Sequence, residues 1–190
     1  ILFICLPTDL VLYFKNIFSK SNILIDQIIC SSYAKSINYK NNLNLSGCVS
    51  FIDVGFNKTS IITYEDDKIL SLDVLPIGGN HITKDISKIL EIDLERSEEI
   101  KLNFDENHKP LNERNISIDI LQKIIFARTE EILELCVKSI NSNSTSDDKF
   151  KMVLAGHGSK ILDNKYKDKI SFSKDIDFLE ETLEDICQSG

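Results

Sequence analysis

The chain has 190 residues, of which 42% are hydrophobic and 27% are charged. That composition is typical of a folded globular protein with one domain or two small ones, and it argues against a disordered chain. Acidic residues outnumber basic residues by 30 to 22, which gives a formal net charge of −8. Nucleic acid is therefore not an expected partner, because a surface of this sign repels a phosphate backbone.

The first residues are predicted to form a strand followed by a helix. Leu2–Leu6 is a short apolar run that ends at Pro7 without the basic flank of a signal peptide. Because the chain starts inside this run and without Met, we expect it to be a fragment of a longer protein. Thr8 or Asp9 can cap the helix. Its apolar face consists of Leu10, Tyr13, Phe14, Ile17 and Phe18.

The next segment is predicted to contain a strand at Ile23–Ile29 and a short helix at Ser31–Tyr39. Lys40–Gly47 is polar, and we expect a loop there that marks a domain boundary.

Three strands are predicted after this boundary, at Val49–Asp53, Thr59–Glu65 and Ile69–Leu75. The turn at Asp66 and Asp67 would make the second and third strands a hairpin.

Two helices are predicted next, the first capped by Asn80 and running to about Leu90, the second capped by Asp93. Asp119–Ile140 is the longest helical pattern, and Lys151–Ala155 is an apolar strand. The apolar residues of the long helix are Ile120, Leu121, Ile124, Ile125, Ile132, Leu135, Cys136 and Ile140. This order indicates an α/β fold with a mixed sheet, because its first strands are hairpin neighbours.

Glycines mark three turns in this order of elements. Asp53–Gly55 and Gly156–Gly158 each stand at the end of a strand, and Gly78–Gly79 precedes a helix. Ligands of open α/β folds lie beyond strand ends, where backbone amides and helix N-termini face anions. Glycine lets the backbone approach a phosphate closely. Each turn alone is weak evidence for a phosphate site, and the informative signal is the order and separation of the three turns.

Several segments resemble a known family. Phe51–Ser60 is similar to the second phosphate hairpin of the actin-like ATPases, and Leu75–Ile86 closely resembles the bacterial cell-division family FtsA. Ser97–Lys101, Ala127–Ile132 and Val153–Ser159 follow in the order of that family.

The resemblance covers roughly residues 2–161 and implies half of an actin-like, ribonuclease H-like ATPase, with a mixed sheet flanked by helices. Residues 1–47 would be the C-terminal part of the family's inserted subdomain with a connecting segment. Residues 48–190 would be the second actin-like half, and its nucleotide- and partner-binding subdomain would lie at about 80–148.

The resemblance also implies a role for each residue of an ATP site. Asp53 would be the catalytic residue, near Mg²⁺ and the attacking water but without a direct metal bond. Gly55 would admit the phosphate tail, and Thr59 would donate its hydroxyl to it. Gly78 and Gly79 would lie beside the phosphates and the ribose.

The adenosine end of this site would be formed by two further pairs. Glu98 and Lys101 are three apart on a helix and would meet the ribose and the adenine edge, while Gly156 and Gly158 would pass close to the adenosine. Without the resemblance, Glu98 and Lys101 would be interpreted as a solvated surface ion pair.

The chain also departs from the family pattern. Phe56, Asn57 and Lys58 fill a hairpin tip that is richer in Gly and Thr in the family, and His157 interrupts the last glycine motif. No first phosphate hairpin is found in this sequence, so we expect the chain alone to bind ATP weakly or not at all.

The implied partners are other division proteins. Arg128 and Glu131 match the helix positions that receive the C-terminal tail of the tubulin-like protein FtsZ, and Arg128 can bind a carboxylate in a bidentate manner. The alternative is that this pair is simply part of a solvated helix face. The resemblance also implies self-association into actin-like filaments and recruitment of later division proteins.

The family attaches to the inner membrane through a basic amphipathic helix at its C-terminus, which we expect to be absent here. Asp175–Gly190 has a helical apolar stripe, but its polar face is acidic and an anionic leaflet would repel it, so we expect a helix packed on the domain surface. The five cysteines form neither a disulfide framework nor a zinc site and suit a reducing compartment. The expected location is the cytoplasmic face of the inner membrane at the division septum.

The leading hypothesis is thus an FtsA-like adaptor that uses ATP as a structural or switching ligand and is at most a weak ATPase. Two alternatives stay open at this point. One is an enzyme of the same superfamily, such as an ATPase or a sugar kinase. The other is a degenerate paralogue without nucleotide, which the altered hairpin tip at Phe56–Lys58 motivates.

Overall fold

The computed structural model shows an α/β fold with one mixed sheet. The parts of the chain that the structure describes are residues 5–43, 45–66, 68–104, 117–143, 151–156, 158 and 176–178. The helices are α1 (Thr8–Ser19), α2 (Ser31–Leu43), α3 (Gly79–Leu90), α4 (Leu94–Leu102) and α5 (Ile118–Asn143). The strands are β1 (Cys48–Val54), β2 (Thr59–Glu65), β3 (Lys68–Leu75), β4 (Lys151–Ala155) and β5 (Ile176–Phe178).

The strands form a five-stranded sheet in the order β3-β2-β1-β4-β5. β1, β2 and β3 pair in antiparallel fashion, whereas β4 runs parallel to β1 and β5 runs parallel to β4. The mixed sheet predicted from the sequence is therefore confirmed. The parallel pair matters for the candidate site, because Asp53 lies opposite Ala155 and both strands end at the same edge of the sheet.

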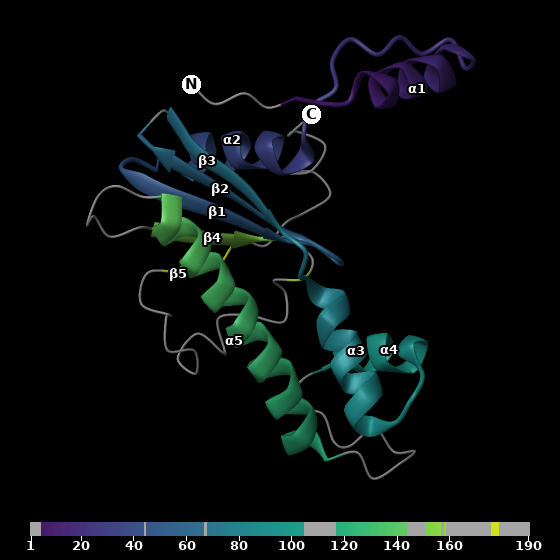
Figure 1. The fold of residues 1–190 in the computed structure, drawn as a ribbon, viewed down its shortest axis with the longest axis vertical. Coiled ribbons are helices and arrows are strands. Elements are labelled where there is room, and N and C mark those ends of the chain that lie inside the picture. Colours follow the sequence, from purple (N-terminus) through teal and green to yellow (C-terminus); the bar gives the residue numbers. More distant parts are fainter. Residues whose placement is uncertain are drawn as a thin grey trace.

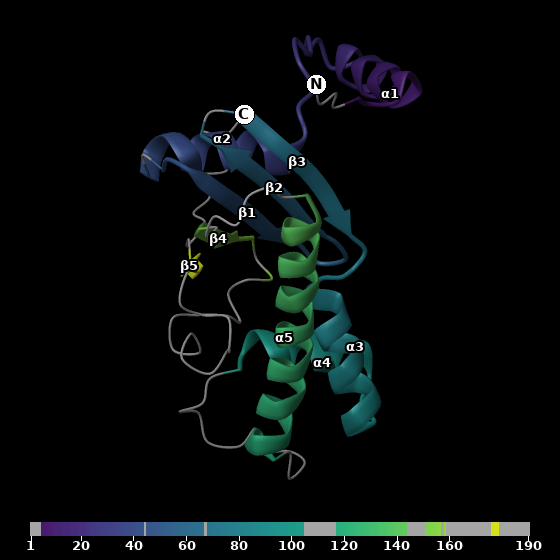
Figure 2. The same cartoon turned by 60° about the vertical axis from the view of Figure 1, so that its left-hand side comes forward.

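Helices cover both faces of the sheet, with α2 on one side and α5 on the other (Figures 1 and 2). Because both faces are covered, β1 and β2 are buried along most of their length instead of alternating between buried and exposed residues. Under α2, the Phe51 ring lies edge-on to Tyr64, with 5.8 Å between the ring centroids, and Tyr39 of α2 stacks on Phe51.

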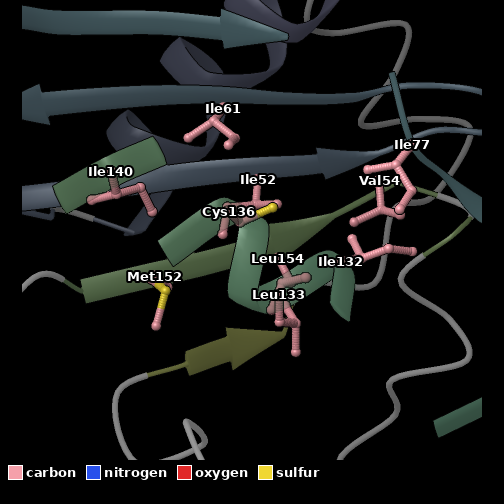
Figure 3. Close-up of a cluster of buried hydrophobic side chains, with 10 residues drawn as sticks. All are labelled: Ile52, Val54, Ile61, Ile77, Ile132, Leu133, Cys136, Ile140, Met152 and Leu154. Carbon is pink, nitrogen blue, oxygen red and sulfur yellow. The ribbon is translucent and has the colours of Figure 1, made fainter. Parts of the chain in front are cut away.

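The core between the sheet and α5 is almost wholly aliphatic (Figure 3). Its buried members are Ile52, Val54, Ile61, Ile77, Ile132, Leu133, Cys136, Ile140, Met152 and Leu154. Burial raises the pKa of the Cys136 thiol to about 12, so this cysteine serves as a small apolar side chain.

A second core lies beyond the strand ends, where α3 and α4 pack beside the first half of α5 (Figure 1). It consists of Ile82, Ile86, Ile100, Leu121, Ile124 and Ile125. α5 contributes to both cores, so this one helix joins the α3–α4 unit to the sheet.

α1 stands apart from the sheet and the other helices in both views, and none of its residues is buried. Its predicted apolar face forms on a helix, but Tyr13 at 61% exposure and Phe14 at 38% have no core beneath them among the described residues. No helix within the described ranges has the length and apolar character needed to cross a membrane.

Some expectations for the N-terminal part are wrong. Residues 23–30 form no strand, and α2 continues to Leu43, so the polar segment from Lys40 is helical for one further turn. Pro7 is the N-cap of α1, without a side-chain hydrogen bond, so neither Thr8 nor Asp9 caps this helix. Of the predicted first strand, residues 2–4 lie outside the described part of the chain, and Cys5 and Leu6 form no strand.

Two further expectations differ from the structure later in the chain. α3 is capped by Gly78 instead of Asn80, which lies inside the helix and donates its side-chain amide to Asn57 Oδ1 at 2.8 Å. Ile176–Phe178, predicted as helix, pairs with the open edge of β4 as a strand, while residues 179–190 lie outside the described part. The Asp93 cap of α4 is confirmed, since its Oδ1 accepts from the Arg96 amide at 2.8 Å.

Candidate functional site

The ends of β1 and β4 meet so closely that glycine is required at two positions. Gly156 has a φ of +90°, and a Cβ there would lie 2.4 Å from Asp53 Oδ1 and 2.7 Å from the Val54 carbonyl oxygen. A Cβ on Gly158 would lie 2.6 Å from the same carbonyl oxygen. The glycines of this turn therefore let the end of β4 pass directly beside the end of β1.

The turn after β1 is fixed to the N-terminus of α3 by backbone hydrogen bonds. The Gly79 amide donates to the Gly55 carbonyl at 3.0 Å, and the Asn80 amide donates to the Phe56 carbonyl at 2.7 Å. A Cβ on Gly78 would lie 2.4 Å from the Gly55 oxygen, so only glycine allows this contact. The first amides of α3 thus face the turn, and the turn and the helix form one unit.

The Thr59 hydroxyl belongs to the same unit. It is fully buried and donates to the Ile77 carbonyl at 2.7 Å, which fixes the start of β2 to the segment before α3. In the structure this hydroxyl is therefore bonded within the protein, whereas the family resemblance implied a phosphate as its partner.

Lys101 and Glu98 form a network that is largely buried, and not a solvated surface pair. The Lys101 ammonium donates to Glu98 Oε2 at 2.6 Å, to Thr83 Oγ1 at 2.9 Å and to the Gly79 carbonyl at 3.2 Å. The Thr83 hydroxyl also contacts Glu98 Oε2. The side chains of Lys101 and Glu98 are 4% and 29% exposed, so the lysine is enclosed and the carboxylate is partly open to a ligand.

Several predicted site residues meet at Gly79. A Cβ there would lie 3.6 Å from Lys101 Nζ, 3.8 Å from the Gly55 oxygen and 3.9 Å from Gly158 Cα, which are ordinary contact distances. The Phe56 ring lies nearby, with its centroid 5.8 Å from Lys101 Nζ. Residues from four separate segments of the chain therefore surround one point at the edge of the sheet.

Asp53 has two partners that the sequence reasoning missed. The Ser32 hydroxyl donates to Oδ2 at 3.1 Å, and the Lys35 ammonium lies 3.5 Å from Oδ1 and 3.4 Å from Oδ2. Both partners come from α2, at the three-residue spacing that places side chains on one helix face. That three-residue spacing is visible in the sequence. The sequence does not show, however, that the partner of both side chains is a carboxylate on β1.

Arg128 also has an unpredicted partner, Asp85 of α3. Its Nε donates to Asp85 Oδ2 at 2.6 Å and its Nη2 donates to Oδ1 at 3.1 Å, while Nη1 contacts Glu131. The hydrogen bond that it donates to Asp85 raises the pKa of the Arg128 guanidinium. This bidentate pair links α3 to α5, and an acidic ligand would have to compete with it.

The residues around Gly79 fit a nucleotide better than they fit a bare divalent cation. Gly79 has room at its Cβ position, and Glu98 offers a partly exposed carboxylate for hydroxyl groups. Asp53 already contacts an ammonium group. Across the described ranges, no three His, Cys, Asp or Glu side chains gather in a way that could hold a metal ion. His157 of the last glycine motif lies outside those ranges.

Comparisons with known proteins agree with this fold. A family model described as "Cell division protein FtsA" matches residues 50–161. FtsA of Streptococcus pneumoniae is 26% identical over 157 residues, which cover 75% of this chain and 34% of that protein. FtsA of Buchnera aphidicola subsp. Schizaphis graminum is 32% identical over 133 residues, covering 61% and 31%. The chain thus spans about a third of the length of these curated relatives.

Solved structures show the same architecture at low sequence identity. MreB5 of Spiroplasma citri, solved with bound ADP, matches with a TM-score of 0.72 and 16% identity over 97% of this chain and 64% of that one. An archaeal actin homologue matches with a TM-score of 0.53 and 15% identity, over 82% of this chain and 52% of that one. The fold is therefore actin-like. Since the family model matches more than half of the chain, the chain belongs to the FtsA family of cell division proteins.

Proposed function

We propose that this chain contributes the nucleotide-binding half of an FtsA-type adaptor and that its ligand is ATP, with Mg²⁺ carried mainly by the phosphates. The observation that carries this proposal is the meeting of Gly55, Gly158 and Lys101 around Gly79 at the edge of the sheet, with the Glu98 carboxylate bonded to Lys101. Ligands of open α/β folds bind at such edges, where the backbone approaches without side chains in the way.

Each residue has a proposed part in this site. The Glu98 carboxylate accepts hydrogen bonds from the ribose hydroxyls, and Lys101 holds that carboxylate in place through its 2.6 Å bond. Gly79 and Gly158 present backbone to the ligand, while Gly156 lets β4 pass beside Asp53. We propose Asp53 as the residue that faces the phosphates and orients the attacking water in a weak ATPase.

In this proposal, Gly78 and Thr59 shape the site without contacting the ligand. Their contacts fix the turn after β1 to α3 and so shape the phosphate side of the site. We therefore assign Thr59 and Gly78 to the scaffold of the site, and Gly55 to the backbone that approaches the phosphate tail.

The experiment is a titration with a fluorescent ATP analogue, using the protein expressed from its whole gene. Glu98→Gln should weaken binding by about tenfold, because a neutral amide is a poorer acceptor for ribose hydroxyls. Glu99→Gln is the matched control, since Glu99 is the next residue on α4 and its exposed carboxylate pairs with Arg96. Equal binding by both variants would remove Glu98 from the site.

We further propose that the protein links FtsZ filaments to the cytoplasmic face of the inner membrane at the septum, forms actin-like filaments and recruits later division proteins. Membership of the FtsA family supports this adaptor role. We propose Arg128 and Glu131 as the contact for the acidic C-terminal tail of FtsZ, in competition with Asp85.

Fluorescence anisotropy with the FtsZ tail peptide tests this contact. Arg128→Ala should abolish binding, because the guanidinium is the proposed carboxylate ligand. Asp85→Asn should strengthen binding, because it removes the charge that holds the guanidinium inside the protein. Weaker binding by Asp85→Asn would instead show that the peptide needs the Arg128–Asp85 pair intact.

A second candidate function is a scaffold without nucleotide, and one observation favours it. The first amides of α3, Gly79 and Asn80, donate to carbonyls of the turn, so they are engaged where a phosphate would otherwise accept. The Phe56 ring at the tip of this turn is 55% exposed and adds bulk on the same side. Loss of every nucleotide signal in the titration, with tail binding retained, would select this function.

A further inference from the structure

We propose that the Lys35 ammonium is the cation that serves the Asp53 carboxylate, so that nucleotide binding by this protein depends little on divalent metal ions. This inference rests on the proposed nucleotide function and specifies how the charge of Asp53 is balanced beside the phosphates. In it, Lys35 balances the charge of the Asp53 carboxylate and also brings a positive charge to the end of β1, where the phosphates would arrive.

The geometry of the pair supports this assignment. Lys35 Nζ lies 3.5 Å from Oδ1 and 3.4 Å from Oδ2 of Asp53, so one ammonium faces both oxygens. Ser32 lies on the same face of α2 and donates to Oδ2 at 3.1 Å. The Lys35 and Asp53 side chains are only 17% and 19% exposed, so dissolved salt screens their attraction less than it would at an open surface.

The surroundings of Asp53 disfavour a second cation. The backbone of β4 lies against the carboxylate, since a Cβ on Gly156 would be 2.4 Å from Oδ1. Mg²⁺ requires a nearly octahedral shell and usually keeps several of its waters. To reach Asp53, a hydrated Mg²⁺ would have to displace Ser32 and approach the ammonium of Lys35, which has the same sign of charge.

The phosphate side of the site also needs a cation from a side chain. The Gly79 and Asn80 amides donate to the carbonyls of Gly55 and Phe56, so they are not directed at a ligand. A lysine ammonium binds phosphate as a compact point charge. Lys35 brings such a charge to the end of β1, where the phosphates of the proposed ligand would arrive.

The first test needs no nucleotide. Mn²⁺ is titrated into the ¹⁵N-labelled protein expressed from its whole gene, and paramagnetic broadening of the Val54 and Gly55 amide signals is measured. Wild type and Lys35→Arg should show little broadening, whereas Lys35→Met should show it strongly, because the carboxylate then lacks its cation. Lys40→Met, which removes a charge from the same helix at its contact with the Tyr64 ring, is the control and should behave like wild type.

Either of two results would overturn the proposal. Strong broadening in wild type would mean that a divalent ion binds Asp53 despite Lys35. Absence of broadening in Lys35→Met, in protein whose circular dichroism matches wild type, would mean that Lys35 does not exclude the metal.

The second test measures affinity for a fluorescent ATP analogue in Mg²⁺ and again in EDTA. Wild type and Lys40→Met should bind within about threefold in the two buffers, whereas Lys35→Met should lose about tenfold or more in EDTA. A merely structural role of Lys35 would weaken binding equally in both buffers and leave the ratio unchanged, which would refute the proposal.

The two tests separate this inference from the function on which it rests. If the wild-type protein binds no nucleotide in either buffer while the Mn²⁺ pattern holds, the proposed ATP function fails and the cation role of Lys35 stands. If nucleotide binds but wild type loses about tenfold in EDTA, the ATP function stands and the role of Lys35 is refuted.

Discussion

The close contact between Gly78 and the turn after β1 predicts that alanine at Gly78 destabilises the fold, whereas alanine at the adjacent Gly79 does not. A methyl group in Gly78→Ala would lie 2.4 Å from the Gly55 oxygen, 2.8 Å from the Phe56 oxygen and 3.0 Å from the Lys58 nitrogen. All three are backbone atoms, so no side chain can rotate away to make room. The turn or α3 must therefore shift as a whole.

The cost follows from the contacts that such a shift breaks. Overpacking costs roughly 1–3 kcal/mol. The Gly79 and Asn80 amide bonds to the turn would also be lost, at about 0.5–1.5 kcal/mol each. Gly78→Ala should thus lower the free energy of unfolding by about 2–6 kcal/mol.

Gly79→Ala is the matched control, because the nearest atom to its methyl would be Lys101 Nζ at 3.6 Å. Alanine also has a higher helix propensity, so the unfolding free energy should stay the same or rise by up to about 1 kcal/mol. Urea denaturation followed by circular dichroism measures the unfolding free energy of both variants. If Gly78→Ala were as stable as Gly79→Ala, the close approach of the turn to α3 would be refuted.

Other predictions test the cores and the buried pair. Ile124→Ala should lower the free energy of unfolding by roughly 2–4 kcal/mol, because Ile124 is only 7% exposed. Ile120→Ala on the same helix, at 46% exposure, should lower it by well under about 1 kcal/mol. Equal losses on urea denaturation would mean that the buried face of α5 is misassigned. Lys101→Met leaves the Glu98 carboxylate without its cation. It should lower the free energy of unfolding by about 1–3 kcal/mol after allowance for the partial exposure of Glu98. Arg96→Met, in the exposed pair with Glu99, should lower it by about 0–1 kcal/mol in the same urea denaturation. Burial raises the pKa of Cys136 to about 12, so iodoacetamide labelling of Cys136 should stay slow from about pH 7 to 9, whereas exposed Cys5 should be labelled readily. Rapid labelling of Cys136 in the folded protein would contradict its place in the core.

The strands and long helices were predictable because their signals are local. β2 and β4 have the predicted bounds, and α5 differs from its predicted ends by only a few residues. In each case the apolar pattern matches the period of the element, and turn residues bound it. Asp93 was also predictable as a cap, since it directly precedes a helix and its carboxylate needs only the amide three residues later.

The errors have a different physical origin. Residues 23–30 are apolar enough for a strand but have no strand to pair with in the described part of the chain, and pairing is not encoded locally. Ile176–Phe178 shows the reverse case, because the free edge of β4 offers hydrogen bonds that outweigh a helical pattern. In both segments the tertiary partner decides the secondary structure.

The candidate site could be predicted as far as its glycines, and for a clear reason. A glycine is visible in the sequence whatever its backbone approaches, and Gly158 does lie beside Gly79. Charged partners are different, because Lys35 lies 18 residues before Asp53 and Asp85 lies 43 residues before Arg128. No local pattern pairs such residues. The family resemblance therefore implied external ligands for Asp53 and Arg128, whereas the fold supplies each with an internal counterion. Whether a ligand can displace that counterion is therefore the question that decides the chemistry of both sites.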